Sequence, residues 1–175
     1  MTPNQTLARR ARVASAASAL GALAVVGGTL FTVSTRPAPE LFSSLGFDSL
    51  AHVSAWQFAV ARGLAALPGV VGGAAFVVLA RAFVRVGQGH VFEPAMAQQL
   101  ARFAALLAVG TALSVAVPVG ASLLLSVGAP PEGGRLSLQL GSPQLMGLVA
   151  SLAVWTFARL MGEAARIHTE NQEFV

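Results

Sequence analysis

Charged residues are the scarcest component of this sequence. They make up 10% of its 175 residues, whereas soluble domains average roughly 25%. Cysteine is absent, which excludes disulfides, thiolate metal sites and thiol nucleophiles. Lysine is absent too, so all 11 basic residues are arginines. Hydrophobic residues make up 55% of the chain, and its mean hydropathy is +0.70. These values exclude an ordinary soluble globule.

Four long runs of the sequence contain no charged residue. These charge-free runs are Val13–Thr35, Gly63–Ala80, Phe103–Pro131 and Leu136–Ala158. A helix needs about 20 apolar residues to cross a hydrocarbon core of about 30 Å, and the shortest run has 18 residues. We therefore predict an all-α membrane protein, a four-transmembrane-helix bundle that forms a single integral membrane domain over residues 1–175. The predicted spans cover residues 13–34, 59–82, 103–127 and 141–160.

The first run follows Arg9, Arg10 and Arg12, as the apolar region of a secretory signal peptide would. The apolar region of a signal peptide has roughly 7–15 residues, however, and it ends at a cleavage site with two small residues. This run has 23 residues, and Phe31–Arg36 contains no Ala-x-Ala pattern. We therefore predict a retained transmembrane helix.

The arginines near the ends of the spans favour one orientation. Eight of them lie in the two tails and in the segment between spans two and three, whereas three lie in the other connections. Because positive residues concentrate on the cytoplasmic side, we predict a multi-pass protein of the bacterial inner membrane with both termini in the cytoplasm. Its arginines then face anionic lipid head groups, and no direct binding of nucleic acid is expected.

Residues typical of a helix start precede the second and third spans. Asp48 is predicted to be the N-cap of a helix that begins at Ser49 and continues into span two. A Gly-rich turn at 87–89 precedes Pro94, which fits the first position of a helix. The apolar residues that then recur at helical spacing are Met96, Leu100, Phe103 and Leu107. They predict a short amphipathic cytoplasmic helix that leads into span three.

Small residues and charged pairs predict contacts of the helices. Gly69-x-x-x-Gly73 and Ala24-x-x-x-Gly28 have the spacing that lets transmembrane helices approach closely.

Arg62, at the edge of span two, is expected to reach back to the membrane interface. Charged residues continue beyond span four at intervals of three or four, at Arg159, Glu163, Arg166 and Glu170. They predict a helical C-terminal stem with Arg–Glu pairs.

The sequence carries no catalytic, cofactor or metal signature. Gly87-Gln88-Gly89 lacks the Lys-Ser/Thr of a P-loop. His52, His90 and His168 are far apart in the sequence and lie outside the charge-free runs. Those runs contain no Asp, Glu or Lys either, which argues against an ion pump or a proton-coupled transporter. We therefore expect a protein that is not an enzyme and that binds no cofactor and no metal.

Two polar segments resemble a known family. Residues 87–94 read Gly-Gln-Gly-His-Val-Phe-Glu-Pro, Leu100-x-Arg102 follows, and residues 170–175 read Glu-Asn-Gln-Glu-Phe-Val. This pattern resembles the bacterial four-helix inner-membrane family catalogued as domain of unknown function family 2975. Members carry a Gly-x-x-Phe-Thr-x-Glu-Asn motif after the second helix, whereas Phe92 is followed here by Glu93 and Pro94.

The resemblance implies no activity, but members are often encoded beside a small helix-turn-helix regulator. We therefore predict that the cytoplasmic loop and the C-terminal tail bind a protein partner, for which such a regulator is the suggested candidate. The predicted partner-binding residues are Gly87, Gly89, His90, Phe92, Glu93, Arg102, Glu170 and Asn171. We also predict that residues 170–175 dock against residues 87–92, with paired short strands as one form of this contact. The alternatives are an accessory structural subunit within a larger membrane complex and, less favoured, a small transporter.

Overall fold

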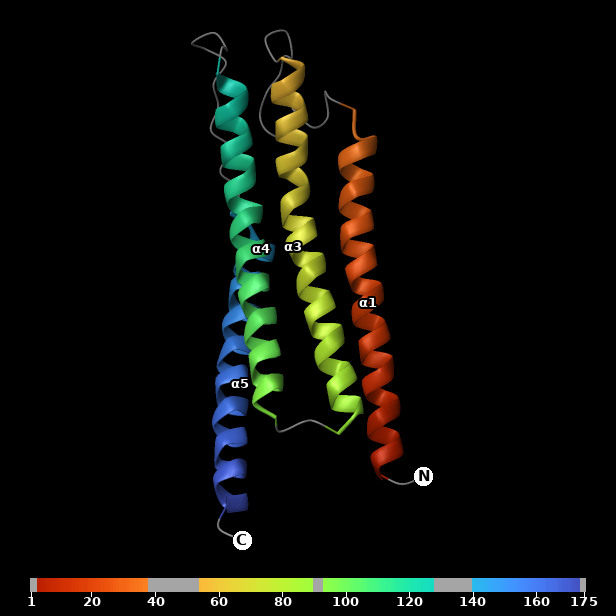
Figure 1. The fold of residues 1–175 in the computed structure, drawn as a ribbon. Coiled ribbons are helices and arrows are strands. Elements are labelled where there is room, and N and C mark those ends of the chain that lie inside the picture. Colours follow the sequence, from red (N-terminus) through yellow and green to blue (C-terminus); the bar gives the residue numbers. More distant parts are fainter. Residues whose placement is uncertain (1–2, 38–53, 90–92, 128–139, 174–175) are drawn as a thin grey trace.

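The structure, a computed structural model, describes residues 3–37, 54–89, 93–127 and 140–173. Within these ranges the chain forms four helices, α1 (Pro3–Thr35), α3 (Ala55–Gly87), α4 (Pro94–Ser126) and α5 (Ser142–Glu173). Successive helices run in opposite directions, so both ends of the chain lie at one end of the molecule (Figure 1). We call this the terminal end, and the opposite end the far end. The start of α1, the end of α3, the start of α4 and the end of α5 thus lie on one side, as predicted.

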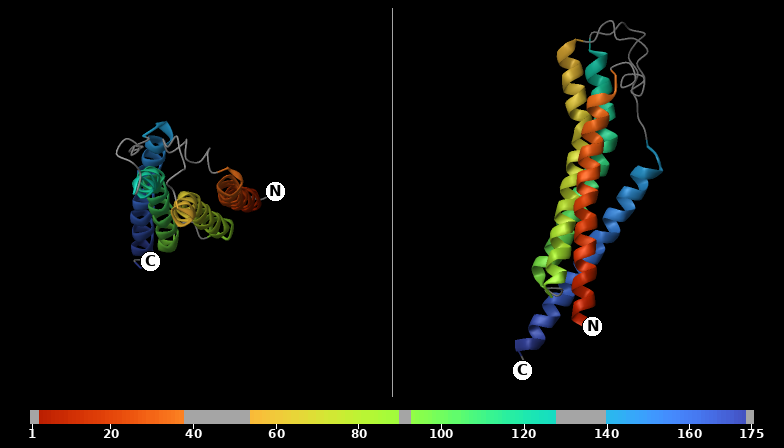
Figure 2. Two further views of the ribbon diagram at one scale, coloured as in Figure 1. Left: turned by 90° about the horizontal axis from the view of Figure 1, so that it is seen from above. Right: turned by 90° about the vertical axis from the view of Figure 1, so that its right-hand side faces the viewer.

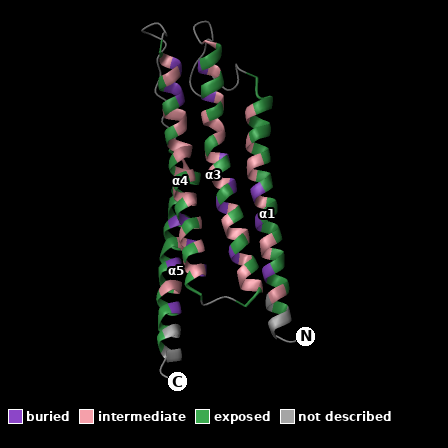
Figure 3. Ribbon diagram, in the orientation of Figure 1, coloured by how far each residue is buried: buried purple, intermediate pink, exposed green. Residues whose placement is uncertain are grey.

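Each helix contains a segment long and apolar enough to cross a membrane. These segments are Ala8–Thr35, Ala55–Gly87, Pro94–Ser126 and Ser142–Ile167. The chain is therefore a multi-pass membrane protein, as predicted. A helix of 33 residues is about 50 Å long at 1.5 Å per residue, which exceeds the hydrocarbon thickness of about 30 Å. All four helices extend beyond the predicted spans at the terminal end, whereas at the far end they stop within four residues of the predicted bounds. Much of their surface is exposed (Figure 3), and the exposed residues include many large apolar ones.

The helices pack in chain order rather than around a common centre. Among the described residues, α1 packs on α3, α3 packs on α4, and α4 packs on α5. The two outermost helices thus have one helical neighbour each, and α5 crosses the others obliquely (Figure 2). The predicted four-helix architecture is confirmed, and the four helices lie in a row.

Glycines allow α1 and α3 to approach closely. A side chain at Gly69 would overlap with Thr29, and one at Gly73 would overlap with Val26. Both glycines are buried, so the contact predicted from Gly69-x-x-x-Gly73 is confirmed. The second motif behaves differently, because a Cβ at Gly28 would meet no atom within 4 Å. In the described residues, Ala24-x-x-x-Gly28 is an exposed face of α1.

At the terminal end, α4 lies between α3 and α5. Met96 and Leu100 of α4 form a buried cluster with Ala82 of α3 and Ala158 of α5. The helix begins at Pro94, as predicted, and Glu93 is its N-cap. It runs without interruption to Ser126. The predicted amphipathic segment is therefore the first part of the membrane-spanning helix α4 rather than a separate helix, since its apolar face packs on α3 and α5.

The packing of α4 on α5 can be tested with a disulfide. A Cβ on Gly162 would lie 3.7 Å from the Cβ of Ala97, close to the mean separation of about 3.8 Å in disulfides. Because the chain has no cysteine, we expect the double variant Ala97→Cys/Gly162→Cys to form an intramolecular disulfide on mild oxidation, measured as a reversible gel shift. In the control, Ala97→Cys is combined with Leu160→Cys, because Leu160 is 63% exposed. Equal crosslinking of both pairs would contradict the packing.

Candidate functional site

The Gly-rich turn that follows α3 is present at the terminal end. The N–H of Gln88 donates to the carbonyl of Arg85 at 3.1 Å, and that of Gly89 donates to Val86 at 3.1 Å. Gly89 has a φ of +91°, a conformation that glycine adopts without steric strain. Gly87 serves a packing role, because a Cβ there would lie 3.3 Å from the Cβ of Ala11 on α1.

The other predicted partner-binding residues are distributed over two helices. Glu93 and Arg102 are exposed on α4, and Arg102 follows the buried Leu100 by two residues, which places it on the opposite face of the helix. Glu170 is exposed on α5. Asn171 also belongs to α5, but its side chain is not described. His90 and Phe92 lie outside the described residues.

The predicted stem of α5 is confirmed. Arg166 pairs with Glu163 at 3.2 Å and with Glu170 at 3.7 Å, and all three side chains are more than half exposed. The helix continues to Glu173, so residues 170–173 do not form the strand considered for them, because they complete helical turns. The C-terminal end of α5 projects past the end of α3 and the start of α4 (Figure 1). That the stem and the segment between α3 and α4 form one binding surface stays a prediction.

The side chain of Gln57 forms four hydrogen bonds at the far end. It is 5% exposed and lies in the first turn of α3. Its Oε1 accepts hydrogen bonds from the N–H of Ser54 at 2.9 Å and from the hydroxyl of Ser54 at 2.8 Å. Its Nε2 donates to the carbonyls of Leu124 and Val127, both at 3.1 Å. One amide group therefore stabilises both the start of α3 and the end of α4.

This arrangement corrects the predicted start of the second helix. The helix that continues into span two begins at Ala55 with Ser54 as its N-cap, not at Ser49. Asp48 and Ser49 themselves lie outside the described residues. Ser54 and Gln57 have the spacing of a capping box, in which the side chain of the fourth residue returns to the backbone N–H of the first. Ser-x-x-Gln directly before an apolar run was the sequence signal for this helix start.

Arg62 joins the ends of α1 and α3. Its Nε donates to the carbonyl of Val33 at 2.5 Å, and one Nη donates to those of Ser34 at 2.8 Å and Arg36 at 3.1 Å. The last carbonyls of a helix lack intrahelical donors and carry partial negative charge, so a cation there is stabilising. Arg62 thus has a defined structural role beyond the predicted reach to the interface.

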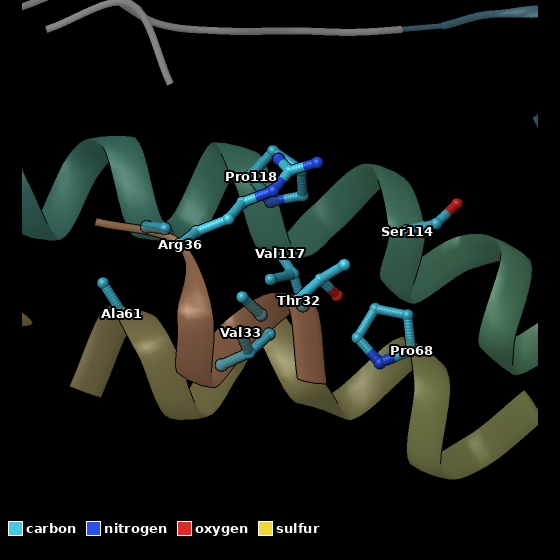
Figure 4. A pocket seen from close by; sticks show the side chains of 10 residues that line it. Thr32, Val33, Arg36, Ala61, Pro68, Ser114, Val117 and Pro118 are labelled. Atoms are coloured by element: carbon cyan, nitrogen blue, oxygen red, sulfur yellow. The ribbon is translucent and has the colours of Figure 1, made fainter. Parts of the chain in front are cut away.

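A groove lies between α1 and α4 near the far end. Its cavity of about 340 Å³ exists because α1 and α4 both pack on α3 and not on each other. Its floor consists of Ala61, Ala65 and Pro68 of α3 (Figure 4). The walls come from α1 and α4, with Thr32, Val33, Arg36, Ser114, Val117, Pro118 and Ala121. We call this the far-end groove; no sequence pattern predicted it, because its three sides come from separate helices.

The described residues contain no group of three or more His, Cys, Asp or Glu side chains that could hold a metal ion. The features found in the same part of the chain are the ion pairs of α5, the hydrogen bonds of Gln57 and Arg62 to helix ends, and the far-end groove. Comparisons with protein-family models, with curated proteins and with solved structures find no match.

Proposed function

We propose that this multi-pass membrane protein binds a protein partner through its terminal end and catalyses no reaction. The observation that carries the proposal is the stem of α5, a charged helix that extends past the neighbouring helix ends. It presents Arg166 between two glutamates. Beside them lies Ile167, an apolar side chain that is 53% exposed. Charged groups around an apolar anchor are suited to a protein interface.

The finer parts of the proposal rest on the sequence. The distribution of arginines favours the cytoplasmic side of a bacterial inner membrane for the terminal end. The resemblance to domain of unknown function family 2975 favours a helix-turn-helix regulator as the partner. The contacting residues would include Glu93, Arg102 and Glu170, which are exposed at this end.

One observation favours the alternative of an accessory subunit in a larger membrane complex. The helix α1 packs on a single neighbour, and Leu20 and Leu23 in its middle are 66% and 71% exposed. This face is available to another transmembrane protein as well as to lipid. A small transporter is the least favoured alternative, because the four charge-free runs offer no ionisable side chain to a polar substrate.

Photocrosslinking in living cells separates these candidates. A photoreactive amino acid replaces Ile167 on the stem in one variant and Leu23 on α1 in the other. We expect the probe at position 167 to capture one protein of defined mass, identified by mass spectrometry, and the probe at position 23 to capture lipid. A protein captured only from position 23 would favour the accessory subunit. Absence of captured protein from both positions would overturn both partner hypotheses.

A further inference from the structure

The far-end groove has an interior suited to hydrocarbon. Seven of its ten lining residues are alanine, valine or proline. The hydroxyl of Thr32 donates to the carbonyl of Gly28 at 2.8 Å, and that of Ser114 donates to the carbonyl of Thr111 at 2.7 Å. Both hydroxyl hydrogens are thus held by the backbone of their own helices, and neither hydroxyl is free to donate to a ligand. Because most of the lining is apolar, the groove favours the apolar part of a ligand.

Arg36 supplies a cation at the rim of this groove. It directly follows the end of α1 at Thr35, and its side chain extends towards Pro118 of α4 (Figure 4). Among the described residues, its guanidinium group has no hydrogen-bond or ion-pair partner, whereas the guanidinium of Arg62 binds backbone carbonyls. The acidic residues with described side chains, Glu93, Glu163 and Glu170, all lie at the terminal end. Arg36 therefore brings a positive charge to the rim of the groove.

An apolar slot with one cation at its rim matches a lipid with an anionic head group. Arg36 lies directly after the apolar span of α1, where the hydrocarbon core gives way to the polar head-group region, and a basic side chain near the membrane surface attracts anionic head groups. The groove lies between two helices that do not pack on each other, and the surrounding bilayer supplies acyl chains. We propose that the far-end groove holds one acyl chain of an anionic phospholipid, whose phosphate binds Arg36. This site is independent of partner binding at the terminal end.

Native mass spectrometry of the full chain tests this site. The protein is released from nanodiscs that contain equal amounts of phosphatidylglycerol and phosphatidylethanolamine, and the lipids that stay bound are counted. We expect about fivefold more phosphatidylglycerol than phosphatidylethanolamine, which corresponds to about 1 kcal/mol for one arginine at the membrane surface. Arg36→Gln should bring this ratio close to one and leave acyl-chain retention intact. Arg12→Gln, which removes the same charge at the terminal end, should leave the ratio unchanged.

A variant that fills the groove tests the position of the acyl chain. Ala65→Phe places a ring on the groove floor and should abolish retention of both lipids. Circular dichroism checks its fold, and Ala65→Leu replaces it if it does not fold. Three results would each overturn the proposal. The groove-filled variant could retain as much lipid as the wild type, or the ratio of phosphatidylglycerol to phosphatidylethanolamine could be the same in Arg36→Gln and Arg12→Gln. The third such result is a wild-type protein that retains no lipid. A bound mass equal to that of a free fatty acid would overturn the phospholipid as the occupant.

Discussion

The Gln57→Glu variant is expected to lose about 3 kcal/mol or more of its unfolding free energy in detergent. The amide of Gln57 donates to two carbonyls at the end of α4, and a carboxylate would present an oxygen to them instead. Each buried polar group left without its partner costs about 1–3 kcal/mol, and a buried unpaired charge adds to that cost. Thermal unfolding followed by circular dichroism in a mild detergent measures the loss.

Two comparisons identify the cause of this loss. Gln98→Glu introduces the same charge on the exposed surface of α4 and should melt close to the wild type. Acidic pH should narrow the difference between Gln57→Glu and the wild type, because a protonated carboxyl can donate a hydrogen bond to one of the two carbonyls. If Gln57→Glu and Gln98→Glu melted at the same temperature, the role assigned to Gln57 would be wrong.

Gln57 also shows which part of the structure local sequence patterns could not predict. The spacing of Ser54 and Gln57 marks a capping box, but Asp48 is an equally good N-cap by residue type. Residue type alone does not rank the two, but the capping box does, because Ala51 stands where Asp48 would need a Glu or Gln. Gln57 also holds the end of α4, about 70 residues away in the sequence, and that contact has no local signature.

The extent of the helices shows a second limit of the same kind. The charge-free run Gly63–Ala80 locates the hydrocarbon-crossing part of α3, yet the helix extends from Ala55 to Gly87. Backbone hydrogen bonding continues where the chain leaves the hydrocarbon, so charge marks the membrane core and not the helix ends. Local start signals set these ends more directly, and the predicted start of α4 at Pro94 was therefore correct.

The contrast between the two small-residue motifs has a geometric reason. The residues of α1 that face α3 include Ala22, Val26 and Thr29, which are spaced four and three residues apart and share one face of the helix. Ala24 and Gly28 lie on a different face. Small-residue spacing shows that a face permits close approach, whereas the arrangement of the whole row decides which face is used. The sequence therefore predicted two possible contacts, and α3 occupies one side of α1 only.

The Gly73→Leu variant is expected to separate α1 from α3 and to cost about 3 kcal/mol, the upper part of the range for overpacked cores. A side chain at this position overlaps with Val26, and the backbone carbonyl of Ala22 lies just behind it. Gly63→Leu is the matched control on the same helix, because a Cβ at Gly63 would meet no atom within 4 Å. Melting temperatures in detergent should fall strongly for Gly73→Leu and stay close to the wild type for Gly63→Leu.

A smaller pair of substitutions tests the same contact atom by atom. Gly73→Ala adds one methyl group, which overlaps with a γ-methyl of Val26, whereas the Cβ of Val26 lies 3.6 Å from it. Val26→Ala removes the overlapping methyl and leaves ordinary van der Waals contact. We therefore expect Gly73→Ala to destabilise the wild-type protein but to have little effect in the Val26→Ala background. Because the two residues are in direct contact, their effects should be non-additive; additive effects would show that Val26 does not limit the approach of α1 to α3.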